Sequence, residues 1–137
     1  MSAIPVLPLS EADIDAIKSV SSAISRKALQ GDWDGLLELF TEDAVLLPPH
    51  SAVIRGRTAF KTMIESFNPK FTDHSIELKD IDGYGDIAYA WGNYTETFSV
   101  SDVPEPTKDV AKLMFIFRKQ PDGSWLVAVE MWNTDLA

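Results

Sequence analysis

The first part of the chain repeats hydrophobic residues at helical spacing. Ser10, followed three residues later by Asp13, resembles an N-terminal capping box. The apolar positions that come next share one helical face: Ile14, Ile17, Val20 and Ile24. The pattern therefore predicts a helix that runs to about Gln30.

Two shorter helices are predicted after Gly31. Gly31 ends the first helix, and Asp32 caps the second, "WDGLLELF". From Arg57, "RTAFKTMIESF" returns to helical spacing. Between them, "AVLLPP" is too short for a helix and ends at prolines, so it is predicted as a short edge strand, and "AVIRG" as a second extended piece.

After Pro69 the hydrophobic period changes to that of strands. Four segments rich in branched and aromatic residues follow: "FTDHSIELKDI", "DIAYAWGNYTETFSV", "DVAKLMFIFRKQ" and "SWLVAVEMWN". They predict a four-stranded antiparallel meander, and hence an α+β fold with the helices on one sheet face. At 137 residues the chain is expected to form one domain, residues 1–137, with residues 1–9 as an N-terminal tail.

The last predicted strands are apolar on both faces. In "SWLVAVEMWN", one alternating set is Trp125, Val127, Val129 and Met131, and the other is Leu126, Ala128, Glu130 and Trp132. Helices cover one face only, and an apolar surface of this size exceeds what a monomer tolerates. We therefore expect a homodimer through the convex sheet face, with strong curling of the sheet within one chain as the alternative.

Charge and composition narrow the classes of partner. The chain carries 12 basic and 21 acidic residues, a net charge of −9, which argues against nucleic acid and anionic membranes. Cysteine is absent, which excludes disulfides and thiol chemistry, and neither a metal nor a cofactor is expected. The first ten residues lack the features of a signal peptide, so a cytoplasmic location is predicted.

Five stretches together resemble the SnoaL-like family of the nuclear transport factor two and ketosteroid isomerase superfamily. They are "GDWDGLLELFTEDAVLLPP", "IRGRTAF", "GDIAYAWGNY", "RKQPDGSW" and "EMWN". The resemblance implies a cystatin-like cone, in which three N-terminal helices pack on a curved, mainly antiparallel sheet around a pocket open at one end. Relatives include isomerases, dehydratases, cyclases and domains that only bind or oligomerise, so function has to be argued from the site.

The wall of the implied pocket is mainly apolar and aromatic. The residues expected to contact a ligand are Trp33, Leu47, His50, Arg55, Phe60, Met63, Tyr94, Met114, Val129 and Met131. Tyr94 shares a strand face with small residues and offers a hydroxyl, although a core tyrosine with a buried partner remains the alternative. His50, after two prolines, is predicted to lie on the rim, as a surface residue, a ligand contact or a catalytic group. Arg55 either forms a salt bridge with Asp43 or Glu42 or reaches an anionic ligand at the mouth.

Proton chemistry would need a poorly solvated acid inside the pocket. Glu130 is the obvious candidate, but the resemblance assigns the inner positions of the last strand to Val129 and Met131. Glu130 is therefore expected on the outer face, paired with Arg118 or Lys112 in the dimer interface, with a solvated or a catalytic position as alternatives.

Three functions stay open at this stage. A small-molecule-binding domain without assignable chemistry is favoured, because the inner positions look apolar. An isomerase, dehydratase or cyclase that works by proton transfer in the same pocket is the alternative. A module that only dimerises is the third.

Overall fold

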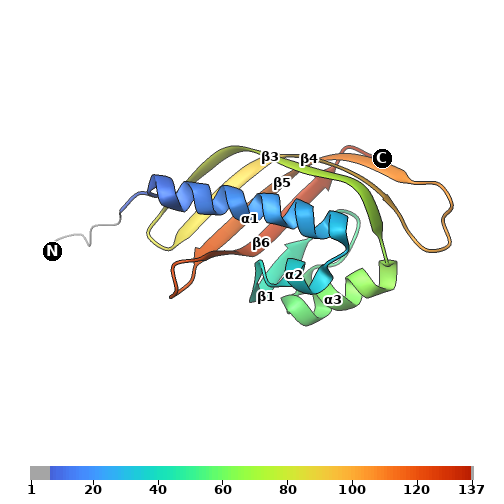
Figure 1. Ribbon diagram of the computed structural model, residues 1–137, viewed down its shortest axis with the longest axis horizontal. Helices are drawn as coiled ribbons and strands as arrows, with labels where there is room; N and C mark the ends of the chain where they lie inside the picture. Colours follow the sequence, from blue (N-terminus) through green and yellow to red (C-terminus); the bar gives the residue numbers. More distant parts are fainter. Residues whose placement is uncertain (1–6, 137) are drawn as a thin grey trace.

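The computed structural model describes residues 7–136. The helices are α1 (Glu11–Gln30), α2 (Trp33–Leu37) and α3 (Gly56–Phe67), and the strands are β1 (Phe40–Leu47), β2 (Ile54–Arg55), β3 (Lys70–Tyr84), β4 (Ile87–Ser99), β5 (Thr107–Lys119) and β6 (Trp125–Thr134). One six-stranded sheet has the order β2-β1-β6-β5-β4-β3, antiparallel except where β1 pairs with β6. The predicted α+β cystatin-like fold, with helices on one face of a curved sheet, is confirmed (Figure 1).

Helix α1 begins and ends where the sequence predicts. The Ser10 hydroxyl accepts from the Asp13 amide, the Asp13 carboxylate accepts from the Ser10 amide, and Gly31 adopts the left-handed conformation at φ 68°. Asp13 also accepts from Trp125 Nε1 and from Lys119 Nζ, each at 3.0 Å. The helix start is thereby tied to the hairpin between β5 and β6. Of the predicted tail, residues 1–6 lie outside the described part of the chain, and Pro8 forms a β-bridge with Tyr84.

The strand predicted at "AVLLPP" is present, but its predicted start and its position at the edge of the sheet were wrong. Strand β1 starts at Phe40 and pairs with β2 on one side and with β6 on the other. Phe40 lies opposite Val127 of β6 and is only 1% exposed, so strand pairing and burial override the helical spacing of "WDGLLELF". Helix α2 consequently ends at Leu37.

The concave sheet face, which faces the helices, is solidly packed at one end. The largest fully buried side chains are Trp125, Phe40, Phe115, Phe117, Ile17, Leu46 and Val127. Toward the other end, the last turns of α1, the helices α2 and α3, and the strands enclose open space instead of packed side chains. The site lies in this hollow end.

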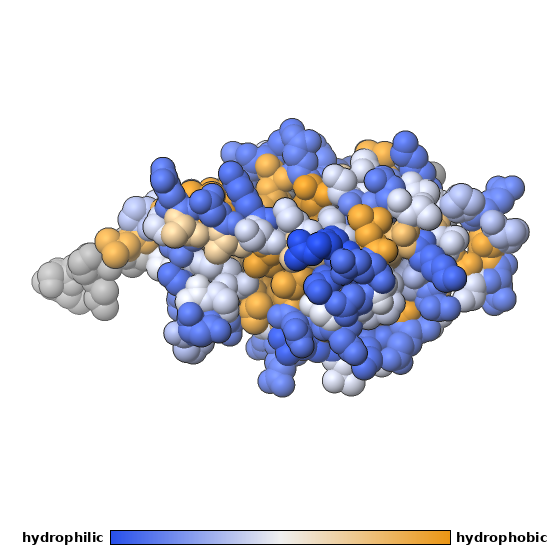
Figure 2. All heavy atoms as spheres, viewed as in Figure 1, coloured by the Kyte–Doolittle hydropathy of each residue, from blue (hydrophilic) through white to orange (hydrophobic). Residues whose placement is uncertain are grey.

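The convex face, which is turned away from the helices, keeps apolar side chains in contact with solvent. Between 39% and 48% of the surface of each of these residues is exposed: Ile87, Tyr89, Trp91, Val110, Met114 and Met131. Curling within one chain therefore leaves them uncovered. In the view of Figure 2, where α1 lies in front of the strands as in Figure 1, hydrophilic side chains dominate and apolar ones form separate patches. No helix among residues 7–136 has the length and hydrophobicity needed to span a membrane.

Candidate active site

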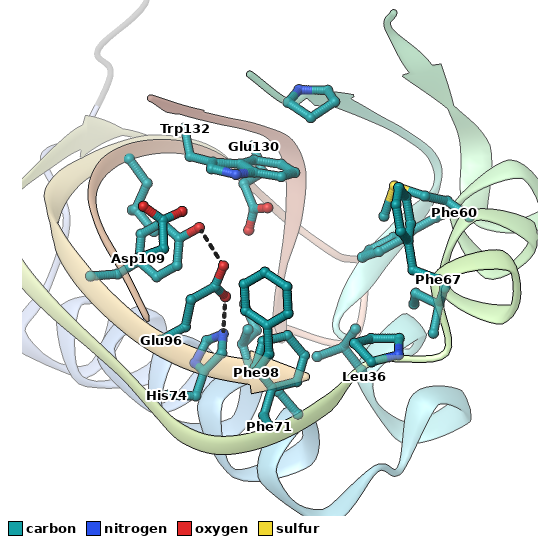
Figure 3. Close-up of a pocket in the computed structure, with 18 of the residues that line it drawn as sticks. Leu36, Phe60, Phe67, Phe71, His74, Glu96, Phe98, Asp109, Glu130 and Trp132 are labelled. Carbon is teal, nitrogen blue, oxygen red and sulfur yellow. Dashed lines mark hydrogen bonds and ion pairs between the residues drawn. The ribbon is translucent and has the colours of Figure 1, made fainter. Parts of the chain in front are cut away.

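A cavity of about 370 Å³ opens between the helices and the sheet. It is lined by α1, α2, α3, the start of β1, the loop after β1, and strands β3 to β6 (Figure 3). Most of its wall is apolar, and the aromatic members are Trp33, Phe40, Phe60, Phe67, Phe71, Tyr94, Phe98 and Trp132. A concave, largely apolar site with few polar groups is typical of small-molecule binding.

Three polar side chains form a row across neighbouring strands on this wall. His74 of β3 lies opposite Glu96 of β4, and Glu96 lies opposite Asp109 of β5. His74 Nε2 is 3.9 Å from Glu96 Oε2, and the Tyr94 hydroxyl donates to Glu96 Oε1 at 3.3 Å. Figure 3 shows this chain of contacts, with Glu96 at its centre.

The row is held from both sides. The Ser25 hydroxyl of α1 is hydrogen-bonded to His74 Nδ1 at 2.8 Å, and the Thr134 hydroxyl of β6 donates to Asp109 Oδ1. The helix and the last strand thus fix the orientation of the outer members.

Glu130 faces this cavity, and its predicted outward position was wrong. In the pairing of β6 with β5, Val129 lies opposite Ile116 and Val127 lies opposite Phe117. Ala128 has no partner and is therefore the extra residue of a β-bulge. The bulge reverses the alternation along β6.

Before the bulge Val127 is buried against the core, and after it Glu130 and Trp132 point into the cavity. Val129 and Met131, the predicted inner residues, turn to the convex face. Their partners in β1 are Val45 and Leu47, whereas Glu130 pairs with the fully buried Leu46.

The cavity shifts the titration of its acids. Desolvation, with a smaller contribution from the charge of Asp109, raises the pKa of Glu96 to about 7, although the Tyr94 hydrogen bond opposes the shift. Desolvation, together with the charge of Glu96, raises the pKa of Glu130 to about 8. Both acids can therefore take up and release protons near neutral pH.

The neighbouring groups stay neutral over the same range. Burial lowers the pKa of His74 to about 4. Desolvation, and then the charge of Glu96, raises the pKa of Tyr94 above its ordinary value. An uncharged imidazole and a phenol that keeps its proton therefore flank Glu96.

The residues predicted to contact a ligand fall into two groups. Trp33, Phe60, Met63 and Tyr94 line the cavity. The others are absent from its wall: Leu47, His50, Arg55, Met114, Val129 and Met131. Four of these, Leu47, His50, Met114 and Met131, line a shallower depression that includes part of the convex face.

His50 and Arg55, the two polar residues predicted at the rim, lie outside the cavity wall. His50 occupies the left-handed region at φ 57° in the loop between β1 and β2, so it shapes a turn. Arg55 is exposed on β2, and among residues 7–136 it forms neither the predicted salt bridge with Asp43 nor the one with Glu42.

Three site residues escaped the sequence argument: His74, Glu96 and Asp109. The signal for the two acids was present, because the alternation that places Tyr94 inward continues to Glu96, and the one that places Ala111 inward extends back to Asp109. His74 had a weaker signal of the same kind, because it alternates with Ile76 and Leu78 in a strand that is otherwise mostly polar. Among the described residues, no group of three or more His, Asp or Glu side chains is arranged to hold a metal ion.

Comparison with known proteins identifies the fold family. A family model described as "SnoaL-like domain" matches residues 25–128, well over half of the chain. The chain belongs to the SnoaL-like family. The resemblance noted in the sequence is therefore confirmed. No curated protein matches this SnoaL-like chain by sequence.

Solved structures similar to the SnoaL-like chain share its fold at low sequence identity. A ketosteroid isomerase-like protein from Erwinia carotovora atroseptica is 19% identical, with a TM-score of 0.83 over 93% of this chain and 100% of that one. An NTF2-like protein with a cystatin-like fold from Novosphingobium aromaticivorans is 20% identical (TM-score 0.66; 90% and 82% covered). ActVI-ORFA from Streptomyces coelicolor is 15% identical (TM-score 0.71; 89% and 96% covered).

Proposed function

We propose that this SnoaL-like protein is an enzyme that moves protons on a mainly apolar ring compound, as an isomerase, dehydratase or cyclase does. One observation carries the proposal: Glu96 and Glu130 face the same apolar cavity, and a tyrosine hydroxyl is hydrogen-bonded to Glu96. The sequence favoured binding without chemistry because the inner positions of the last strand looked apolar. With Glu130 turned inward by the bulge, that reason no longer holds.

Glu130 is the proposed general base. No protein hydrogen bond occupies its carboxylate among the described residues, and its side chain is directed into the cavity (Figure 3). A carboxylate with a pKa of about 8 is a stronger base than an ordinary glutamate, and it can return the proton as an acid later in the reaction.

Tyr94 and Glu96 are the proposed donors to the oxygen that gains negative charge. Tyr94 keeps its proton at neutral pH and would donate it to this oxygen in place of Glu96 Oε1, and Glu96 in its protonated form adds a second donor on the same side of the cavity. Donors fixed in an apolar site stabilise a developing enolate more strongly than water does. Proton abstraction next to a carbonyl is the step that isomerisation, dehydration and cyclisation share.

The proposal can be tested without knowing the product. Incubation with cyclic ketones such as tetralone and decalone in heavy water, followed by mass spectrometry, measures deuterium uptake at the carbon next to the carbonyl. Wild-type protein should catalyse the exchange, Glu130→Gln should lose it by about 100-fold or more, and Tyr94→Phe should reduce it less.

The matched control is Glu65→Gln, because Glu65 is an exposed glutamate on α3. It should exchange as fast as wild type. Equal exchange by Glu130→Gln and wild type, or no exchange above buffer with any ketone of the panel, would contradict the assignment.

A further inference from the structure

The cavity holds acids without any basic side chain to balance them. Glu96, Asp109 and Glu130 all line it, and none of the described residues in its wall is a lysine or an arginine. The remaining titratable groups on the wall are His74 and Tyr94, both neutral near pH 7. Buried carboxylates in proteins normally have a cationic partner or a metal.

Glu130 is the acid of this cavity that has no hydrogen-bond donor among the described residues. Asp109 accepts from Thr134, and Glu96 accepts from Tyr94, but no described residue donates to Glu130. Figure 3 shows the carboxyl groups of Glu96 and Glu130 directed toward the same space. A positively charged group placed there would lie close to both acids.

Aromatic rings surround the same space. Phe71 contacts His74, Phe98 and Trp33, with ring centroids 5.3, 5.7 and 6.1 Å apart. The indole of Trp132 lies next to Glu130 on β6, two residues along the strand. Carboxylates beside aromatic faces form the kind of site that binds organic ammonium groups.

We propose that the ligand of this cavity is an amine: a protonated nitrogen attached to an apolar ring body, with the nitrogen between Glu96 and Glu130 and the rings against the phenylalanines. The inference rests on the proposed function for the cavity and assigns a substrate class to it. With an ammonium group bound, Glu96 is its anionic partner, and Tyr94 alone remains as the donor to the oxygen that gains negative charge. The inference also implies that carboxylates, phosphates and other anions are rejected, because the wall offers them no cation.

Binding of an ammonium group should release protons. At pH 7 Glu130, with a pKa of about 8, is mostly protonated and Glu96, with a pKa of about 7, is partly protonated. A cation a few ångströms away lowers both pKa values toward the ordinary range. A neutral ligand of the same shape gives no such release. This difference separates recognition inside the cavity from a general attraction of cations to a chain with a net charge of −9.

The experiment compares three probes that share one ring system: naphthylmethylamine, naphthylmethanol and naphthoate. Isothermal titration at pH 8 should show the amine binding about tenfold tighter than the alcohol, with no binding of naphthoate, and the preference should shrink at pH 6. Titration at pH 7 in two buffers with different ionisation enthalpies should report proton release for the amine alone. Glu130→Gln should weaken the amine at least fivefold and leave the alcohol unchanged, whereas Glu65→Gln should change neither.

The outcomes distinguish this inference from the proposed function. If the alcohol binds as tightly as the amine, or if none of the probes binds the folded protein, the amine assignment is wrong, while deuterium exchange on ketones would still support proton transfer. If the amine is preferred in the predicted way but no ketone exchanges, the ligand class stands and the proposed chemistry is wrong.

Discussion

The side chain of Glu130 is poorly solvated in the cavity, and this makes the stability of the fold depend on pH. Its pKa is about 8 in the folded protein and close to the ordinary glutamate value when the chain is unfolded. Between these two values the folded state binds more protons than the unfolded state. The free energy of unfolding therefore falls as the pH rises from about 4.5 to about 8, and it levels off above that window.

Glu130→Gln should remove much of this pH dependence. The variant should match wild type in stability at pH 5 and exceed it by roughly 1–3 kcal/mol at pH 8.5, since each pKa unit corresponds to about 1.4 kcal/mol. Urea unfolding followed by tryptophan fluorescence at a series of pH values measures the difference. Glu65→Gln, the exposed control, should run parallel to wild type. A Glu130→Gln variant that loses stability at pH 8.5 would show that the carboxylate is not desolvated in solution.

At the scale of the elements, the position of β3 depends on a glycine in β4. A Cβ atom added at Gly92 would run into the carbonyl oxygen of Glu77 and the Cα of Leu78 on the neighbouring strand. The register between the two strands shifts at this point, between Leu78 and Asp80. The two backbones approach each other closely here, and the strands bend at the same point. This bend helps β3 and β4 to form the cavity wall.

Gly92→Ala should therefore separate the strands and destabilise the fold by about 2 kcal/mol or more, because the obstructing atoms belong to the backbone and cannot rotate away. Chemical denaturation gives the value. Gly31→Asn is the matched control, since Gly31 is left-handed at φ 68° with open space around it, and asparagine tolerates that conformation. Equal stability of Gly92→Ala and wild type would mean that the strands have room for a side chain.

How far the sequence predicts the site depends on the regularity of each strand. The facing of β4 and β5 follows from strict alternation, so Tyr94, and by extension Glu96 and Asp109, can be placed inward from the sequence alone. The facing of β6 cannot, because a one-residue bulge at Ala128 leaves no mark in a segment that is apolar on both sides. A different ambiguity affected β1. Its first residue, Phe40, also fits the helical spacing of the segment before it, so the sequence did not show where the helix ends and this eight-residue strand begins.

On the scale of the whole molecule, the two faces of the sheet have different uses. The concave face is filled at one end and hollow at the other, while the convex face carries a row of exposed apolar side chains. Trp91 of β4 lies opposite Met114 of β5, and Met114 lies opposite Met131 of β6. The three residues are 41%, 39% and 48% exposed. We propose that a second copy of the chain covers this row, sheet against sheet about a two-fold axis, because such a row is self-complementary and lies on a broad, regular surface.

The proposed dimer can be tested by its mass and by a variant that disrupts the interface. Light scattering of the wild-type protein at micromolar concentration should give twice the 15.2 kDa of one chain. Met114→Asp places a charge at the centre of the row and should yield monomers, because burying an unpaired carboxylate between two sheets costs several kcal/mol. The fold of the variant should persist, because Met114 is exposed on the convex face and is not part of the core. Far-ultraviolet circular dichroism tests this. Val103→Asp, in the exposed loop between β4 and β5, adds the same charge away from the row and should remain dimeric. A wild-type protein that scatters as a single chain would refute the interface, and a dimeric Met114→Asp variant would place it on another surface.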